Sequence, residues 1–329
     1  MRIPGVKTAK KISRWLQARI LGGALILGHH RITDETHDGY DVCVSPKHFE
    51  EQMDAVRKYT HPIPLSRLVM YLKEGSLPPR LVAVTFDDGY ADNLYQAKPI
   101  LEKYEVPATI FLCSGYAGKE FWWDELERLV LSSRADPREL RLGKGQFIWN
   151  HPMASPEVGA VTEVTRRREF RQALYHFLLP LDIDERDASM ELIRGWAGVL
   201  SNEIVGHRSM NQEELLQLAE GGLIEIGSHT RNHPMLPQLS VPRQAEEIMW
   251  GKRDLEAVIG RPVAGFSYPN GQATRDAKRI VDELGFVFAC TSLQDVVRPG
   301  CDIFEMPRFW QRNVDGDRFM RSLNLWLSA

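Results

Sequence analysis

The stretch Leu81-Val-Ala-Val-Thr-Phe86-Asp87-Asp88-Gly89-Tyr90 decides the fold prediction for this chain. Its first six residues form a short run of apolar and β-branched side chains, which is typical of a strand buried on both faces of a parallel sheet. Two carboxylates follow at once, at the position where parallel α/β folds bind their ligands. The stretch therefore predicts a buried parallel strand with a functional site at its carboxyl end.

Similar runs recur along the chain and are separated by helical patterns. Further strands are predicted at 20–28, 108–113, 222–228, 263–267 and 286–290. Helices are predicted from 45, over 92–103, after 211, from 240 and over 273–284. This alternation predicts an α/β fold with a mostly parallel sheet, either open or closed. The region of about 116–210 breaks the rhythm, and we expect a mainly helical insertion there.

Composition limits the class of protein. The 329 residues are 43% hydrophobic and 26% charged, which is typical of a globular protein and excludes a disordered or fibrous chain. The net charge of −3 gives no general attraction to nucleic acid, and we expect no nucleic-acid partner. The four cysteines are scattered without a C-x-x-C pair, which excludes a cysteine-rich zinc module and favours reduced thiols.

The amino-terminal segment, residues 1–20, is basic and precedes the predicted catalytic domain at 21–329. No apolar run reaches the roughly 18–20 residues that span a bilayer. The run at 20–28 is favoured as a first buried strand, because no small-residue cleavage site follows it. An uncleaved export signal is the alternative. Residues 8–19 predict a basic helix, either solvated or resting on an anionic membrane. We expect a cytoplasmic protein, with that peripheral membrane contact left open.

Two motifs at predicted strand ends carry candidate metal ligands. Adjacent carboxylates such as Asp87 and Asp88 repel each other, and a cation relieves the cost; helix capping is the alternative and explains only one of them. His229 and His233 are four residues apart in a predicted loop, and exposed loop histidines are the alternative. One Asp-His-His site suits zinc, but also iron, cobalt, nickel or manganese. Its open coordination positions predict metal-assisted hydrolysis of an amide or ester.

Three motifs resemble those of the polysaccharide deacetylases of carbohydrate esterase family 4. They are TFDDGY at 85–90, HTRNHP at 229–234 and FSYPNG at 266–271, in the family's order. The resemblance extends over about 21–310, with the insertion interrupting it. It implies a distorted (β/α) barrel that removes N-acetyl groups from amino sugars, acting on an N-acetylated glycan or glycolipid.

The resemblance also implies roles for individual residues. Asp87 corresponds to the general base that activates water, and Asp88, His229 and His233 correspond to the metal ligands. The backbone N–H of Tyr90 corresponds to a donor that shares the oxyanion with the metal. These roles agree with the site that the carboxylates and histidines already indicate.

Two departures from the family pattern leave roles to fill. Ser267 stands near the place where many members carry an arginine paired with the catalytic aspartate, and Arg308 is a candidate replacement; a surface arginine is the alternative. No histidine follows His233, so the family's carboxyl-terminal general acid is missing. His30 is the candidate general acid, with a packing role as the alternative. Because adjacent strand residues face opposite sides, His29 and His30 should not both enter the site.

Substrate contacts are predicted on two sides of the site. Pro269 and Gly271 of the third motif are expected to shape a groove wall that Tyr268 lines. Trp123 and Asp124 are candidates to stack on a sugar ring and bind its hydroxyls, with anchoring of the insertion as the alternative.

The leading hypothesis is a metal-dependent deacetylase of a polysaccharide, glycolipid or glycan precursor. A second is a nucleotide-sugar glycosyltransferase that uses Asp87 and Asp88 as a metal-diphosphate clamp, which leaves the histidine pair without a role. A third is a carbohydrate-binding relative without turnover, suggested by the missing arginine and terminal histidine.

Overall fold

The computed structural model describes residues 23–34, 39–143, 147–149, 163–198 and 207–328. The predicted amino-terminal segment, with the helix expected at 8–19, lies outside the described residues. Within the described part, no helix combines the length and the apolar character needed to cross a membrane.

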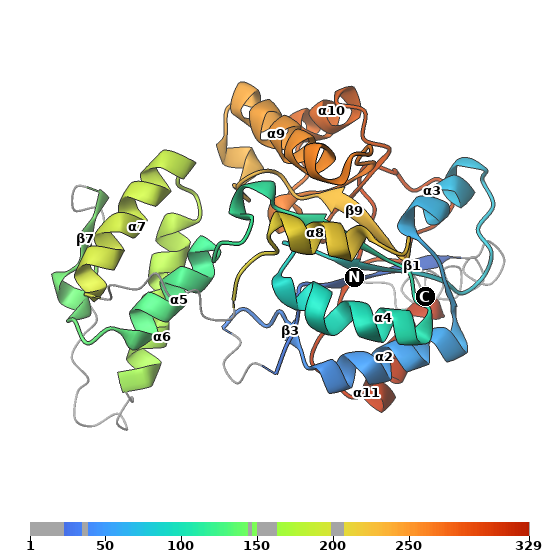
Figure 1. Ribbon diagram of the computed structural model, residues 1–329, viewed down its shortest axis with the longest axis horizontal. Helices are drawn as coiled ribbons and strands as arrows, with labels where there is room; N and C mark the ends of the chain where they lie inside the picture. The colour runs from blue at the N-terminus through green and yellow to red at the C-terminus, as the bar shows by residue number, and fades with distance from the viewer. Residues whose placement is uncertain (1–22, 35–38, 144–146, 150–162, 199–206, 329) are drawn as a thin grey trace, which may run out of the picture.

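A curled parallel sheet forms the centre of the molecule (Figure 1). Its strand order is β11-β10-β9-β6-β5-β1-β12, with β4 also paired to β5. The strands are β1 (Ala24–His29), β4 (His61–Pro62), β5 (Leu81–Phe86), β6 (Ala108–Leu112), β9 (Ile224–Ser228), β10 (Gly265–Ser267), β11 (Phe288–Cys290) and β12 (Phe309–Trp310). The segment before β12 also pairs with β11, through a parallel bridge between Cys290 and Met306. The sheet therefore curls into a half-barrel, which confirms the predicted fold class.

Helices cover the outside of the sheet. They are α2 (Pro46–Tyr59), α3 (Leu65–Lys73), α4 (Lys98–Tyr104), α8 (Gln212–Ala219), α9 (Val241–Ile259), α10 (Arg275–Glu283) and α11 (Gly316–Leu327). Shorter elements are β2 (Arg31–Ile32) paired with β3 (Cys43–Val44), the π-helix η1 (Asn93–Ala97), and the 3₁₀ turns η2 (Ser114–Tyr116), η3 (Pro137–Glu139), η5 (Leu236–Gln238) and η6 (Pro269–Gly271). The capping box that starts α8 joins Asn211 and Glu214, at the start expected from the sequence.

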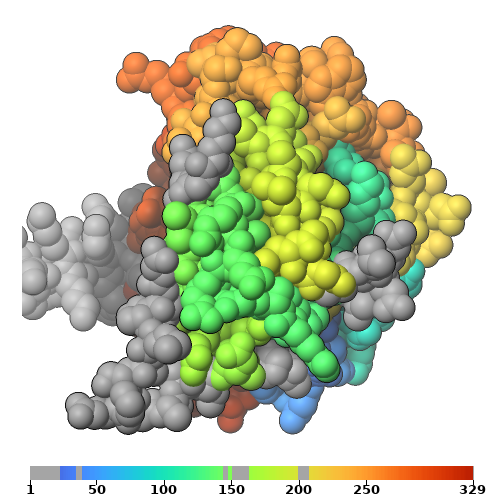
Figure 2. Space-filling model, turned by 90° about the vertical axis from the view of Figure 1, so that its left-hand side faces the viewer, coloured from blue at the N-terminus to red at the C-terminus, as the bar shows by residue number. Residues whose placement is uncertain are grey.

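Between β6 and α8 the chain forms a group of helices with its own apolar core. It contains α5 (Trp122–Ser132), α6 (Glu163–Leu178), α7 (Ile183–Ala197) and the antiparallel pair β7 (Arg141–Leu142) and β8 (Phe147–Ile148). These helices lie at one end of the molecule in Figure 1 and cover the face shown in Figure 2. We call α5–α7 the helical insertion. Its Phe170, Leu174 and Ile193 have no exposed surface, so it packs as a second core beside the barrel.

The arginines of α6 do not behave as one solvated face. Arg166 and Arg168 are exposed, whereas Arg171 is buried. The Arg171 guanidinium lies 4.4 Å from the ring centre of Tyr40 and donates to the carbonyl of Gly39. Arg171 therefore ties the insertion to the loop before β3.

Strand register brings the functional segments together. Phe86 at the end of β5 pairs with His29 of β1 and Ile110 of β6. Ser228 at the end of β9 pairs with Leu112 of β6 and with Phe266 of β10. All these pairs are parallel, so the residues that follow each strand emerge at the same edge of the sheet.

Candidate metal centre and substrate cavity

Asp88, His229 and His233 converge at this edge. Asp88 Oδ1 lies 3.7 Å from Nε2 of His229 and 3.7 Å from Nε2 of His233. One ligand atom from each residue fits within a span of 4.8 Å. Ligands about 2.0 Å from a tetrahedral ion are roughly 3.3 Å apart, so little movement is needed to bind one. Asp88 Oδ1 is buried without a hydrogen-bond partner, which fits a ligand atom that a metal would satisfy.

A tight turn aims both aspartates at the site. Asp88 has φ of 71° and Gly89 has φ of 84°, and the N–H of Gly89 donates to the carbonyl of Asp87. A Cβ at residue 89 would lie 2.7 Å from Cγ of Leu112, so only glycine fits there. The strained conformation of Asp88 is the kind that concentrates at functional sites.

The loop that carries the two histidines is also strained. Thr230 has φ of 64° and His233 has φ of 50°, and the Thr230 hydroxyl accepts from the N–H of His233. Nδ1 of His229 lies 2.7 Å from the carbonyl oxygen of Ser267. Because a carbonyl only accepts, Nδ1 carries the proton, and Nε2 presents a lone pair toward Asp88.

Burial sets the protonation of the three candidate ligands. It lowers the pKa of His229 and that of His233 below the ordinary histidine value, so both imidazoles are neutral and suited to bind a cation. Burial, with the charge of Asp87 beside it, raises the pKa of Asp88 well above the ordinary aspartate value. A metal ion would relieve that cost, because it stabilises the ionised carboxylate.

Arg308 grips Asp87. Nη1 of Arg308 donates to Oδ1 of Asp87 at 2.7 Å, and Nη2 donates to Oδ2 at 2.8 Å. The hydroxyl of Ser267 donates to Oδ2 at 3.0 Å and accepts from Nη2 of Arg308. Burial opposes the carboxylate charge, yet Arg308 and then His229 hold the pKa of Asp87 well below its ordinary value. Arg308 is therefore a buried partner of Asp87, as expected if it replaces the family's arginine. The alternative of a surface arginine is wrong.

A cavity of about 430 Å³ opens over these residues. Aromatic rings and a few polar groups line it, which is typical of a ligand pocket. The lining includes Tyr40, Asp87, Asp88, Trp122, Trp123, Tyr175, His229, His233, Asn270, Gly271 and Trp310. His30 lines it as well, and its ring stacks on Trp310 with ring centres 4.5 Å apart.

The comparisons with known proteins agree with this geometry. A sequence profile described as polysaccharide deacetylase matches residues 74–135 and 199–289. A poly-β-1,6-N-acetyl-D-glucosamine N-deacetylase of Staphylococcus aureus is 37% identical over 111 residues, which are 30% of this chain and 38% of that protein. The chain thus matches less than half the length of this curated relative. The residues that the profile matches contain the aspartate and histidine motifs of the metal centre.

Over these residues, the chain is similar to the polysaccharide deacetylases.

Solved structures support the family fold. IcaB from Ammonifex degensii aligns with a TM-score of 0.60 and 20% identity, over 94% of this chain and 98% of that one. The Streptococcus pyogenes deacetylase PplD, solved with acetate, aligns with a TM-score of 0.59 and 16% identity, over 92% and 99%. At these identities the likeness shows a shared fold.

Three predicted substrate contacts need correction. Tyr268 has no exposed surface and packs against Phe266 in the main core, so it does not line the groove. Pro269 is also buried, and Asn270 and Gly271 line the cavity in their place. The turn η6 directs these last two residues outward, which the alternation of a simple strand would not predict.

Asp124 is the third correction. It is buried, and its carboxylate accepts from the hydroxyl of Tyr90 at 2.8 Å, while the indole N–H of Trp123 donates to the same hydroxyl. Burial raises the pKa of Asp124 to about 7. Asp124 therefore anchors the insertion to the barrel, whereas Trp123 both stacks on Phe121 and reaches the cavity.

His29 ends β1 and His30 follows it, and the two histidines separate as predicted. His29 is buried between Phe49 and Phe86, and burial lowers its pKa to about 4. His30 faces the cavity. Sequence reasoning missed Tyr40, Tyr175 and Trp310 in the cavity wall; of these, only Trp310 carried a signal, as an aromatic residue at the end of a short strand.

Proposed function

We propose that this protein is a metal-dependent hydrolase that removes the N-acetyl group from an amino sugar of a polysaccharide, glycolipid or glycan precursor. One observation carries the proposal: Asp88, His229 and His233 meet at an open face of the cavity with the ionised Asp87 beside them. The named activity of the Staphylococcus aureus relative supports the substrate class. We propose zinc as the metal, because one carboxylate and two imidazoles form a ligand set that zinc prefers.

The residues around the cavity divide the chemistry. A metal ion held by the three ligands would lower the pKa of water and polarise the amide carbonyl. Asp87 accepts the water proton; its two bonds from Arg308 fix the carboxylate in one orientation and keep it ionised at neutral pH. The N–H of Tyr90 donates to the oxyanion.

Protonation of the leaving amine needs a donor on the cavity wall. His30 is the candidate, because it lines the cavity with Asp87 and is held by stacking on Trp310. The ring stacking fixes the imidazole plane, which favours transfer of a proton in a defined direction.

The glycosyltransferase hypothesis is disfavoured by the same geometry. A diphosphate clamp would need both aspartates on the metal, yet Arg308 occupies both oxygens of Asp87. It would also leave His229 and His233 without a function beside Asp88.

Acetate release from a panel of N-acetylated glycans, with metal analysis of the same samples, tests the proposal. Asp88→Asn should lose bound metal and activity, whereas Asp87→Asn should keep the metal and lose activity by about 10²-fold or more. His30→Gln should slow turnover with metal content unchanged, and His61→Gln, at an exposed strand residue, is the matched control. Metal binding without hydrolysis of any glycan would favour the carbohydrate-binding hypothesis instead.

A further inference from the structure

Asn232, the residue directly before His233, is held on both sides by charged groups. Glu247 of α9 accepts from the backbone N–H of Asn232 and from its side-chain amide, both at 2.8 Å. Arg186 of α7 donates from Nη2 to the carbonyl oxygen of Asn232 at 3.3 Å. A carboxylate from the barrel and a guanidinium from the helical insertion thus restrain one residue of the metal-binding loop.

Arg186 is an unusual residue to find in this place. Its side chain is 1% exposed and lies over the ring of Trp122, 5.2 Å from the ring centre. Among the residues that the structure describes, no carboxylate comes within ion-pair distance of Arg186, and its Nε has no hydrogen-bond partner. A buried cation without an ion pair is costly. Its contact with Asn232 is therefore its main polar interaction.

The metal-binding loop depends on such restraints. Its positive φ angles at Thr230 and His233 are disfavoured for residues other than glycine, and they persist only where the surroundings hold them. Arg231 contributes another contact, since its N–H donates to the carbonyl of Glu247.

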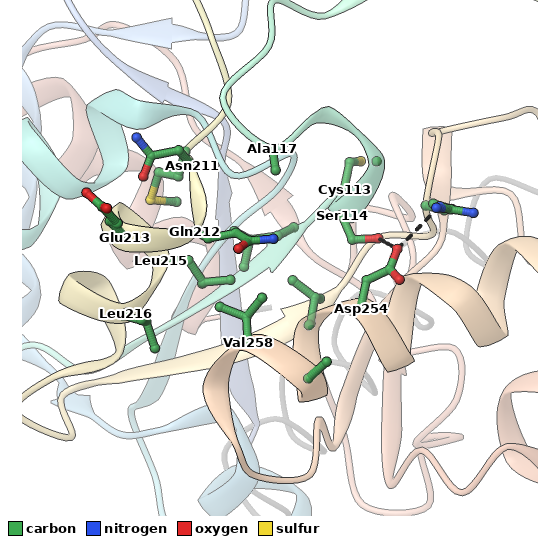
Figure 3. Close-up of a pocket in the computed structure, with 16 residues that line it drawn as sticks. Cys113, Ser114, Ala117, Asn211, Gln212, Glu213, Leu215, Leu216, Asp254 and Val258 are labelled. Atoms are coloured by element: carbon green, nitrogen blue, oxygen red, sulfur yellow. Dashed lines mark hydrogen bonds and ion pairs between the residues drawn. The ribbon is translucent and has the colours of Figure 1, made fainter.

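One side of the metal-binding loop borders a second cavity. This cavity, of about 720 Å³, is lined by α8, α9 and the loop, including Arg231 and Asp254 (Figure 3). Asp254 accepts from the hydroxyl of Ser114 at 2.9 Å and pairs with Arg231 at 3.3 Å. At this cavity Arg231 is held by its polar contacts with Asp254 and Glu247.

We propose that Arg186, together with Glu247, is a positioning residue that fixes Asn232 and so holds His233 ready to bind the metal. The helical insertion is then part of the metal centre as well as a wall of the substrate cavity. The inference rests on the proposed function, because it assigns a role to residues that support the metal ligands.

Zinc affinity tests this role without any need for turnover. Zn²⁺ is titrated against a chromophoric chelator in the full chain, and Arg186→Met should weaken binding about 10-fold or more, as loss of a supporting contact does at other metal sites. Arg194→Met is the matched control: Arg194 lies on the same helix and pairs with Glu125 and Glu191. It should bind zinc within about twofold of the wild type. Arg186→Lys, which keeps a donor and the charge, should recover part of the loss.

Hydrogen–deuterium exchange of the metal-free chain gives a second readout. The amides of Asn232 and His233 should exchange faster in Arg186→Met and unchanged in Arg194→Met. Zinc affinity within twofold of the wild type together with unchanged exchange would overturn the proposal. If Arg186→Met does not fold, Glu247→Gln tests the other side of the same restraint and should weaken zinc binding severalfold. A wild-type chain that binds no zinc would refute the proposed function, while the exchange comparison would still decide whether Arg186 holds the loop.

Discussion

Removal of Arg308 should destabilise the protein by leaving Asp87 buried without its partner. The two side chains share two short hydrogen bonds, and their exposed fractions are 0% and 4%. Breaking a buried ion pair by removing one partner costs about 3–5 kcal/mol, because the remaining charge stays desolvated. We therefore expect Arg308→Met to lower the free energy of unfolding by about 3–5 kcal/mol, measured by urea denaturation at pH 7.

A double-mutant cycle separates this ion pair from other contacts of Arg308, which also donates to the carbonyl of Thr291. Asp87→Asn, Arg308→Met and the double variant are compared with the wild type. Since the double variant removes both charges, its loss should be smaller than the sum of the single losses by about 1–3 kcal/mol. Additive losses would contradict the claim that the two side chains act as a pair.

The same pair predicts a pH dependence. The folded pKa of Asp87 lies below its unfolded value of 3.8, so the stabilisation is present above pH 3.8 and is lost as the pH falls toward the folded value. In Arg308→Met burial is no longer offset by a cation, and the pKa of Asp87 should rise. The acid limb of the acetate-release profile should then move to higher pH; an unmoved limb would refute the assigned electrostatic role.

Three further predictions concern other parts of the fold. Gly251→Ala should weaken zinc binding and lower the stability of the protein, because a Cβ there would lie 2.6 Å from the backbone of the metal-binding loop. Gly195→Ala is the control: a Cβ there would have nothing within 4 Å, and the variant should be more stable than the wild type by about 0.5–1 kcal/mol. Glu214→Gln should cost about 0.5–2 kcal/mol through the lost ion pair with Arg208, because a glutamine oxygen can still accept from the N–H of Asn211. The bond from Arg208 lowers the pKa of Glu214 to about 2, so in urea titrations the difference from the wild type should vanish as the pH falls from 4.5 to 2. Because folded Asp124 keeps its proton up to a pH of about 7, the free energy of unfolding of the wild type should fall by about 1 kcal/mol or more between pH 4 and pH 8. Asp124→Asn should remove this contribution to the fall.

Much of the fold and the centre of the site could be predicted from sequence because the signals are local. The run at 81–86 forms β5 with the bounds expected, and β6, β9 and β10 lie within their predicted ranges. A parallel sheet places all its carboxyl ends at one edge, so the acidic doublet and the histidine pair could be placed together before any coordinates. The predicted meeting of Asp88 with His229 and His233 agrees with the observed 3.7 Å separations.

The cavity wall could not be predicted in the same way. Tyr40 comes from the loop before β3 and Tyr175 from α6, and only the packing of the insertion on the barrel brings them to the same cavity. Tyr268 failed as a predicted contact because it is extended and packs in the core with Phe266, whereas Ser267 between them faces Asp87. Asp124 failed because burial beside Tyr90 removes it from solvent.

Sequence alone determined which residue types lie at the strand ends, and these fix the metal chemistry, since ligand preference and strand periodicity are properties of short segments. Tertiary structure alone decided which charges meet. Arg308 lies far along the chain from Asp87, yet folding buries the two charges beside each other. A buried charge is stable only next to a group that compensates it, and that neighbour is chosen by the packing of distant elements, which no local pattern records.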